Sequence, residues 1–164
     1  MRDPVIQRLD DEAAIRRLAA FYSDAVTHLD AARAASVYAE DGVVAIAGNE
    51  LAGRFAIEAG MRETFARFSL LQLVEHGGLV EVTGDQASAR WSTVELAVRT
   101  GAEALGIIFG RYEDRLVRLP EGWRFARRTF TLAGRTQIET AKLQLDPSFA
   151  GGPEALFALS PRQP

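Results

Sequence analysis

The hydrophobic pattern of the chain changes near residue 69, from helical spacing before it to strand alternation after it. Helices are predicted over residues 10–28, 30–39 and 54–68. The first has the clearest apolar stripe, formed by Ile15, Leu18, Phe21 or Tyr22, Ala25 and Val26. Asp10 or Asp11 is expected to cap it. A short strand over 43–47, a Gly48-Asn49 turn and a return strand over 50–53 are predicted between the second and third helices.

Long strands are predicted for the second half of the chain. They cover residues 70–82, 87–98, 103–119 and 122–145, and the last two form a hairpin around Pro120, Glu121 and Gly122. Apolar Trp123 and Phe125 alternate with Arg124 and Ala126, which is typical of a strand with one buried face. Gly77-Gly78 predicts a bulge or bend within the first long strand.

This order of elements predicts an α+β fold. We expect a cone in which a curved antiparallel sheet wraps around the N-terminal helices and encloses an apolar cavity. Residues 1–145 are predicted to form this domain. Residues 146–164 form a tail that contains Pro and Gly, and its Phe149, Leu156 and Phe157 suggest docking over the pocket mouth or at an oligomer contact.

Composition narrows the chemistry. The chain has 164 residues, a net charge of −3 and no cysteine, so disulfides and thiolate catalysis are excluded. With only His28 and His76 available, a His-rich metal site is not expected, and we predict neither metal nor cofactor. The charge balance argues against nucleic acid as a partner. No apolar run has the length of a membrane span and the N-terminus is not a signal peptide, so a cytoplasmic protein is expected.

Three stretches of the sequence resemble a known protein family. They are AIRRLAAFYSDAVTHLDAARAASVYAED at 14–41, VEVTGDQASARW at 80–91 and GRYEDRLVRLPEGWRFARR at 110–128. Together they resemble the SnoaL-like branch of the nuclear transport factor two-like superfamily, which includes scytalone dehydratase, ketosteroid isomerase and a hexachlorocyclohexane dehydrochlorinase. The resemblance implies an α+β cone with a deep apolar pocket, cofactor-free acid–base chemistry in the catalytic members, and a homo-oligomer, dimer or trimer.

The resemblance also implies where catalytic residues would fall. Dehydratase-type members have an Asp on the first helix, and this chain has Thr27 there, with Asp30 at the family's second, capping position. They have a His on the first long strand, where this chain has Leu73. They have an Arg late in the sheet, and Arg128 is present. Neither Thr nor Leu can accept a proton near neutral pH, so this pair cannot supply a general base.

Other pocket-facing positions follow from the same resemblance. The ligand-binding residues it implies are Val26, Thr27, Phe68, Leu71, Leu73, Thr93, Ile108, Phe130 and Leu132. The candidate catalytic residues are Glu95, Arg128, Tyr22 and Tyr112. In the functional interpretation, Glu95 is a general base, Arg128 orients it or binds an oxyanion, and a tyrosine donates a hydrogen bond. In the structural interpretation, Glu95 and Arg128 form a buried pair, or Glu95 points outward.

Three further side chains lie near the predicted pocket in the sequence. His28 is expected to interact with the end of the first helix, and His76 should face away from the cavity unless a bulge reverses it. Glu75 lies two residues from Leu73 and so points to the same face of its strand, and it is expected at the rim of the pocket. The first hypothesis is therefore a cofactor-independent lyase, dehydratase or isomerase that acts on a small hydrophobic, aromatic or polycyclic, hydroxy or keto compound. The alternative is a non-catalytic binding domain for small apolar ligands.

Overall fold

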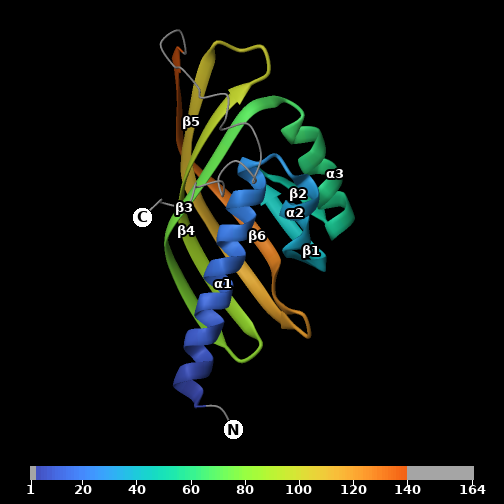
Figure 1. The fold of residues 1–164 in the computed structure, drawn as a ribbon, viewed down its shortest axis with the longest axis vertical. Helices are drawn as coiled ribbons and strands as arrows, with labels where there is room; N and C mark the ends of the chain where they lie inside the picture. Colours follow the sequence, from blue (N-terminus) through green and yellow to red (C-terminus); the bar gives the residue numbers. More distant parts are fainter. Residues whose placement is uncertain (1–2, 140–164) are drawn as a thin grey trace, which may run out of the picture.

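The computed structural model describes residues 3–139, which form three helices and a six-stranded curved sheet (Figure 1). The order of strands in the sheet is β2-β1-β6-β5-β4-β3. Helix α1 runs across the sheet, and α2 and α3 gather with β1 and β2 at one side (Figure 1). The predicted α+β class is confirmed. The predicted tail, from Asp146 onward, lies outside the described residues.

Helix α1 (Pro4–Thr27) begins six residues earlier than the sequence pattern predicted. The side chain of Asp3 accepts a hydrogen bond from the backbone of Val5 at 2.8 Å, and Pro4 occupies the first helical position, where its missing N–H costs nothing. The buried face carries Ile15, Ala19, Tyr22 and Val26 at helical spacing. The helix ends because Leu29 takes a left-handed conformation, with φ of 56°.

The remaining helices are short and connect α1 to the sheet. Asp30 caps α2 (Ala31–Ser36) through a hydrogen bond to the backbone N–H of Arg33. Strand β1 (Tyr38–Ile46) then starts five residues earlier than predicted and pairs with β2 (Asn49–Ala52). Helix α3 (Arg54–Phe65) follows and buries Ile57, Met61 and Phe65.

Four long strands make the body of the sheet. They are β3 (Phe68–Thr83), β4 (Gln86–Arg99), β5 (Ala104–Leu119) and β6 (Gly122–Glu139), each antiparallel to the next along the chain. The register of β3 and β4 shifts between His76 and Leu79, which matches the irregularity predicted at Gly77-Gly78. One pairing departs from the antiparallel expectation: β1 lies parallel to β6. The alternation of residues within each strand does not reveal such a pairing between distant segments.

Two hydrogen bonds hold α1 against β3, at the edge of the sheet. The guanidinium of Arg16 donates to the carbonyl of Gly78 at 2.6 Å, and the backbone N–H of Leu73 donates to the hydroxyl of Thr27 at 3.2 Å. Side chains from the inner face of the sheet and the buried face of α1 form the core. The inner face is therefore the side on which a helix-covered site can form.

Candidate functional site

Cross-strand register defines rows of side chains on the inner face of the sheet. Residues directly opposite one another on paired strands point to the same face. One row joins Leu73, Glu95 and Ile108. The next row holds Glu75, Thr93, Gly110 and Leu132, and the one after it Trp91, Tyr112 and Phe130. Most residues that the sequence assigned to a pocket thus belong to three adjacent rows on one face.

Arg128 lies in a fourth row, opposite Asp114, and is fully buried. Its Nε and Nη2 donate to the two carboxylate oxygens of Asp114, at 2.9 and 3.0 Å. This two-pronged geometry suits the planar guanidinium. Trp91 Nε1 donates to the same carboxylate at 2.8 Å. Burial opposes the charge of Arg128, but Asp114 and then Glu75 outweigh it, so that its pKa is raised well above the usual value.

Three aromatic rings enclose the same guanidinium. Its central carbon lies 4.4 Å from the ring centre of Tyr22 and 4.2 Å from those of Tyr112 and Phe125. Such cation–π contacts are strongest where water is excluded. Tyr22 and Tyr112 meet edge to face, with ring centres 6.0 Å apart. Arg128 therefore fixes the positions of both tyrosines. The guanidinium nitrogens of Arg128 face the carboxyl groups of Asp114 and Glu75.

Glu75 supplies a second carboxylate to Arg128. Its side chain is only 4% exposed, and Oε1 lies 2.9 Å from Nη1 of Arg128. This contact lacks hydrogen-bond geometry, and among the described residues neither Glu75 oxygen nor Nη1 has a hydrogen-bond partner. Burial raises the pKa of Glu75, and the Arg128 charge opposes that rise. The sequence interpretation placed Glu75 at the rim, whereas the structure buries it beside Arg128.

Glu95 has a different environment. It is half-buried between Leu73 and Ile108 in its row. The expected pairing of Glu95 with Arg128 is wrong: Arg128 contacts Glu75 and Asp114, and within residues 3–139 no ion pair to Glu95 occurs. Burial alone raises the pKa of Glu95, with no nearby cation to oppose it. This carboxyl group is suited to hold or release a proton nearer to neutral pH than an exposed glutamate.

Tyr22 and Tyr112 are buried beside these charges. Burial raises the pKa of Tyr22 and raises that of Tyr112 well above the usual value, and the Arg128 charge opposes both shifts. Glu75 and Glu95 each add to the rise at Tyr112, so this phenol lies within the field of both carboxyl groups. A neutral tyrosine in this position can donate a hydrogen bond to a ligand oxygen.

The other predicted ligand-binding residues differ in exposure. Val26, Leu71, Leu73 and Thr93 are buried, and the half-buried ones are Thr27, Phe68, Ile108 and Phe130. Leu132 is 49% exposed, at the outer end of its row. The Thr27 hydroxyl is occupied by the N–H of Leu73, so the two positions where the resemblance expects an acid–base pair hold a structural contact instead.

The two histidines lie outside the three rows. His28 ends α1, where Nδ1 lies 2.8 Å from the carbonyl of Asp24, as expected for a residue near a helix terminus. His76 is exposed on β3. Within residues 3–139, no group of three His, Cys, Asp or Glu side chains could hold a metal ion. No helix among these residues is both long and apolar enough to cross a membrane.

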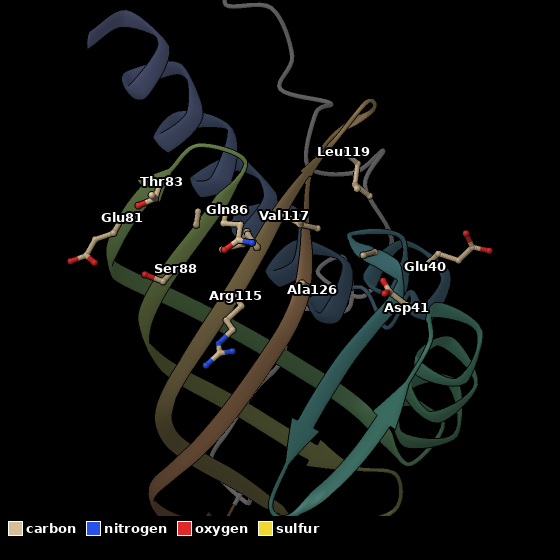
Figure 2. Close-up of a pocket in the computed structure, with 13 residues that line it drawn as sticks. Glu40, Asp41, Glu81, Thr83, Gln86, Ser88, Arg115, Val117, Leu119 and Ala126 are labelled. Atoms are coloured by element: carbon tan, nitrogen blue, oxygen red, sulfur yellow. The ribbon is translucent and has the colours of Figure 1, made fainter. Parts of the chain in front are cut away.

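Two hollows mark the opposite, outer face of the sheet. The larger, of about 1000 Å³, lies between β1 and the β3–β5 strands, with Asp41, Glu81 and Arg115 around it (Figure 2). The second adjoins it and shares Glu81, Ser88 and Arg115. Neither is lined by a residue of the predicted site. The apolar cavity expected on the inner face stays a prediction.

Comparison with known families agrees with this architecture. The family model of the SnoaL-like domain matches residues 7–129, which covers all three helices almost completely and most of the sheet. The chain belongs to the SnoaL-like domain family. No protein with a curated description matches this SnoaL-like chain in sequence.

Solved structures place the SnoaL-like chain within the nuclear transport factor two-like superfamily. An NTF2-like protein with a cystatin-like fold from Novosphingobium aromaticivorans is 28% identical, with a TM-score of 0.68 over 81% of this chain and 92% of that one. A protein from the same organism, provisionally named a scytalone dehydratase, is 21% identical, with a TM-score of 0.76 over 82% of this chain and 92% of that one. Hexachlorocyclohexane dehydrochlorinase LinA-type3 from Novosphingobium barchaimii is 18% identical, with a TM-score of 0.76 over 87% of this chain and 98% of that one. At these two lower identities, the likeness concerns the fold alone.

Proposed function

We propose that this SnoaL-like protein is a cofactor-independent lyase or isomerase in which Glu95 is the general base. The observation that carries the proposal is the environment of Glu95: a half-buried carboxyl group between Leu73 and Ile108, with a raised pKa and no ion-pair partner among residues 3–139. A base whose pKa approaches the working pH transfers protons most effectively. A carboxylate that protein cations do not hold is free to take a proton from a substrate.

Tyr112 is the proposed hydrogen-bond donor. Glu95 lies opposite Ile108, four residues before Tyr112 on β5, which separates the two backbone positions by about 13 Å. Side chains on a strand stand roughly perpendicular to the sheet, so a molecule of one or two rings that lies over the row between Glu95 and Tyr112 would contact both. Loss of a proton from carbon to Glu95 would leave an enolate, whose oxygen the Tyr112 hydroxyl would stabilise.

Apolar neighbours support a hydrophobic hydroxy or keto compound as substrate. Ile108 lies in the row of Glu95 and Phe130 in the row of Tyr112, and both are half-buried. Phe68, also half-buried, packs against the core. Apolar walls with a few polar groups are typical of small-molecule sites. Tyr22 is proposed to support Tyr112 by its edge-to-face contact, and Arg128 enters as a positioning residue that holds both rings. Two structures with the same fold carry the names of a dehydratase and a dehydrochlorinase, and both names denote lyases, the class proposed here.

One observation favours a second candidate, a non-catalytic binding domain for small apolar ligands. Thr27 and Leu73 contact each other at the positions where the resemblance expects proton-transfer residues. A chain that has lost those groups can keep its apolar walls and bind without turnover. This candidate predicts saturable binding and no product.

The substitution Glu95→Gln tests the proposal. The protein is incubated in D₂O with a panel of one- and two-ring hydroxy and keto compounds, and NMR follows carbon-bound proton exchange and product formation. Wild type should exchange or convert at least one compound, and Glu95→Gln should lower that rate by about 100-fold or more while binding persists. Glu113→Gln, exposed on β5, is the matched control and should leave the rate unchanged. Undiminished turnover in Glu95→Gln would overturn the role of Glu95, and binding without any turnover in wild type would support the second candidate.

A further inference from the structure

The buried charges around Arg128 do not balance. Asp114 binds two nitrogens of the guanidinium and alone matches its charge. Glu75 is a surplus carboxyl group, 2.9 Å from the remaining nitrogen and enclosed by protein. Among residues 3–139 neither Glu75 oxygen has a partner with hydrogen-bond geometry, although the Ser23 hydroxyl is close enough to help lower the pKa of Glu75. A structural ion pair would be expected to satisfy these atoms, because an unpaired buried polar atom destabilises the fold.

The tyrosine rings touch the same guanidinium. The ring of Tyr112 lies 4.2 Å from the central carbon of Arg128, on β6, and Glu75 reaches that guanidinium from β3. The charge on Glu75 therefore changes the electrostatic potential that this buried cluster produces at Tyr112. Four elements bring titratable or charged groups that act on Tyr112: Tyr22 on α1, Glu75 on β3, Glu95 on β4 and Arg128 on β6.

We propose that Glu75 is a positioning residue which, through Arg128, tunes how strongly the Tyr112 hydroxyl donates a hydrogen bond to a bound carbonyl or enolate oxygen. The inference rests on the proposed function for the identity of that oxygen, but the electrostatic link between Glu75 and Tyr112 can be measured without substrate. An ionised Glu75 weakens the phenol as a donor, because its negative charge lowers the potential at Tyr112 below that of the neutral Arg128–Asp114 pair. A protonated Glu75 leaves that potential in place and makes Tyr112 a stronger donor.

The composition of the chain makes the link measurable. Its three tyrosines, Tyr22, Tyr38 and Tyr112, lie in one contact cluster. Growth on 3,5-difluorotyrosine, whose fluorines lower the pKa of the hydroxyl, therefore gives ¹⁹F resonances from these three residues alone. Replacing each tyrosine by Phe assigns them. The pH midpoint of the Tyr112 resonance is then compared in wild type, Glu75→Gln and Glu75→Leu, each with the full chain and no ligand.

Removing the Glu75 charge should move the Tyr112 midpoint to lower pH by about one unit, as expected for a unit charge at short range in a partly screened interior. Glu75→Asp should restore most of the wild-type midpoint. Glu81→Gln, on the same strand but on the outer face, should leave the midpoint within about 0.2 units of wild type, as expected for a screened surface charge. Glu75→Leu keeps the test open where Gln does not fold, because it requires no hydrogen bonds.

A Tyr112 midpoint that is the same in Glu75→Leu as in wild type would overturn the inference, since a purely structural Glu75 alters thermal stability without altering this resonance. The outcome is independent of catalysis. A shifted midpoint together with full turnover in Glu95→Gln would support the Glu75 inference and refute the assignment of Glu95. An unchanged midpoint together with an inactive Glu95→Gln would do the reverse.

Discussion

Asp114 is the residue whose loss we expect to damage the fold most. It accepts three hydrogen bonds in the core, two from Arg128 and one from Trp91. Asp114→Asn keeps the shape of the side chain, removes its charge and turns an N–H₂ group toward donors. Arg128 would then be a fully buried cation that faces Glu75 alone.

The expected loss follows from these contacts. Breaking one partner out of a buried ion pair costs about 3–5 kcal/mol, mostly because the other charge stays buried. Glu75 can compensate in part by remaining ionised, so we expect about 3 kcal/mol. Domains of this size unfold with roughly 5–15 kcal/mol, so the variant should fold but lose a large share of its stability.

Urea denaturation at pH 7, followed by circular dichroism and tryptophan fluorescence, measures this loss. Glu113→Gln, the exposed neighbour on β5, is the control and should change the free energy of unfolding by less than about 0.5 kcal/mol. The double variant Asp114→Leu, Arg128→Met should lose less than the sum of its single variants, because neither member of the pair is left without the other. Glu75, which then lacks its cation, can take up a proton, since burial raises its pKa. A loss below about 1 kcal/mol in Asp114→Asn would refute the claim that this pair holds the core.

Two further predictions concern pH and have opposite signs. Burial raises the pKa of Glu95, so its ionisation destabilises the fold once the pH rises above the pKa of a free glutamate. In urea titrations, Glu95→Gln should therefore be more stable than wild type at pH 8 and equal to it near pH 4. Greater stability of wild type at pH 8 would contradict this. The pKa of Asp11 is lowered, chiefly by its hydrogen bonds to Arg118, so its contribution is present above about pH 4, the value for a free aspartate, and is lost as pH falls through the folded pKa. Asp11→Asn should therefore flatten the acid side of the stability profile, with Asp41→Asn, exposed on β1, as the control. An unchanged acid slope in Asp11→Asn would argue against this role.

Alternation in the sequence predicted the long strands because each has one buried and one exposed face. Trp91, Thr93 and Glu95 alternate with exposed or half-buried neighbours on β4, and the structure has these three on one face. Local patterns were weaker at the ends of elements. The early start of α1 depends on the Asp3 cap and on Pro4, which precede the apolar stripe from which the helix was predicted.

The partner of Arg128 could not be predicted, because the register of the β5–β6 hairpin shifts between Arg115 and Leu116. Counting outward from the turn without that shift pairs Asp114 with Arg127. With it, Asp114 lies opposite Arg128 and the two can bind. No Gly or Pro marks the shift in the sequence. The sequence therefore contained no sign that Asp114, and not Glu95, is the partner of Arg128. The alternation along β3 predicted that Glu75 faces inward. It could not predict how deeply Glu75 is buried, because that depends on how α1 lies over β3.

The parallel pairing of β1 with β6 has a consequence for how the chain reaches its structure. Strands β3 to β6 pair with one another in chain order and can assemble as a meander of successive hairpins. Strand β1 instead needs β6, which begins at Gly122, so it waits for the last strand to emerge during synthesis. The ion pair between Asp11 and Arg118 closes the same long loop. Contacts between such distant segments slow folding, because the intervening chain must be ordered before they form. The β1–β2 hairpin therefore docks on the sheet last, although it is made early.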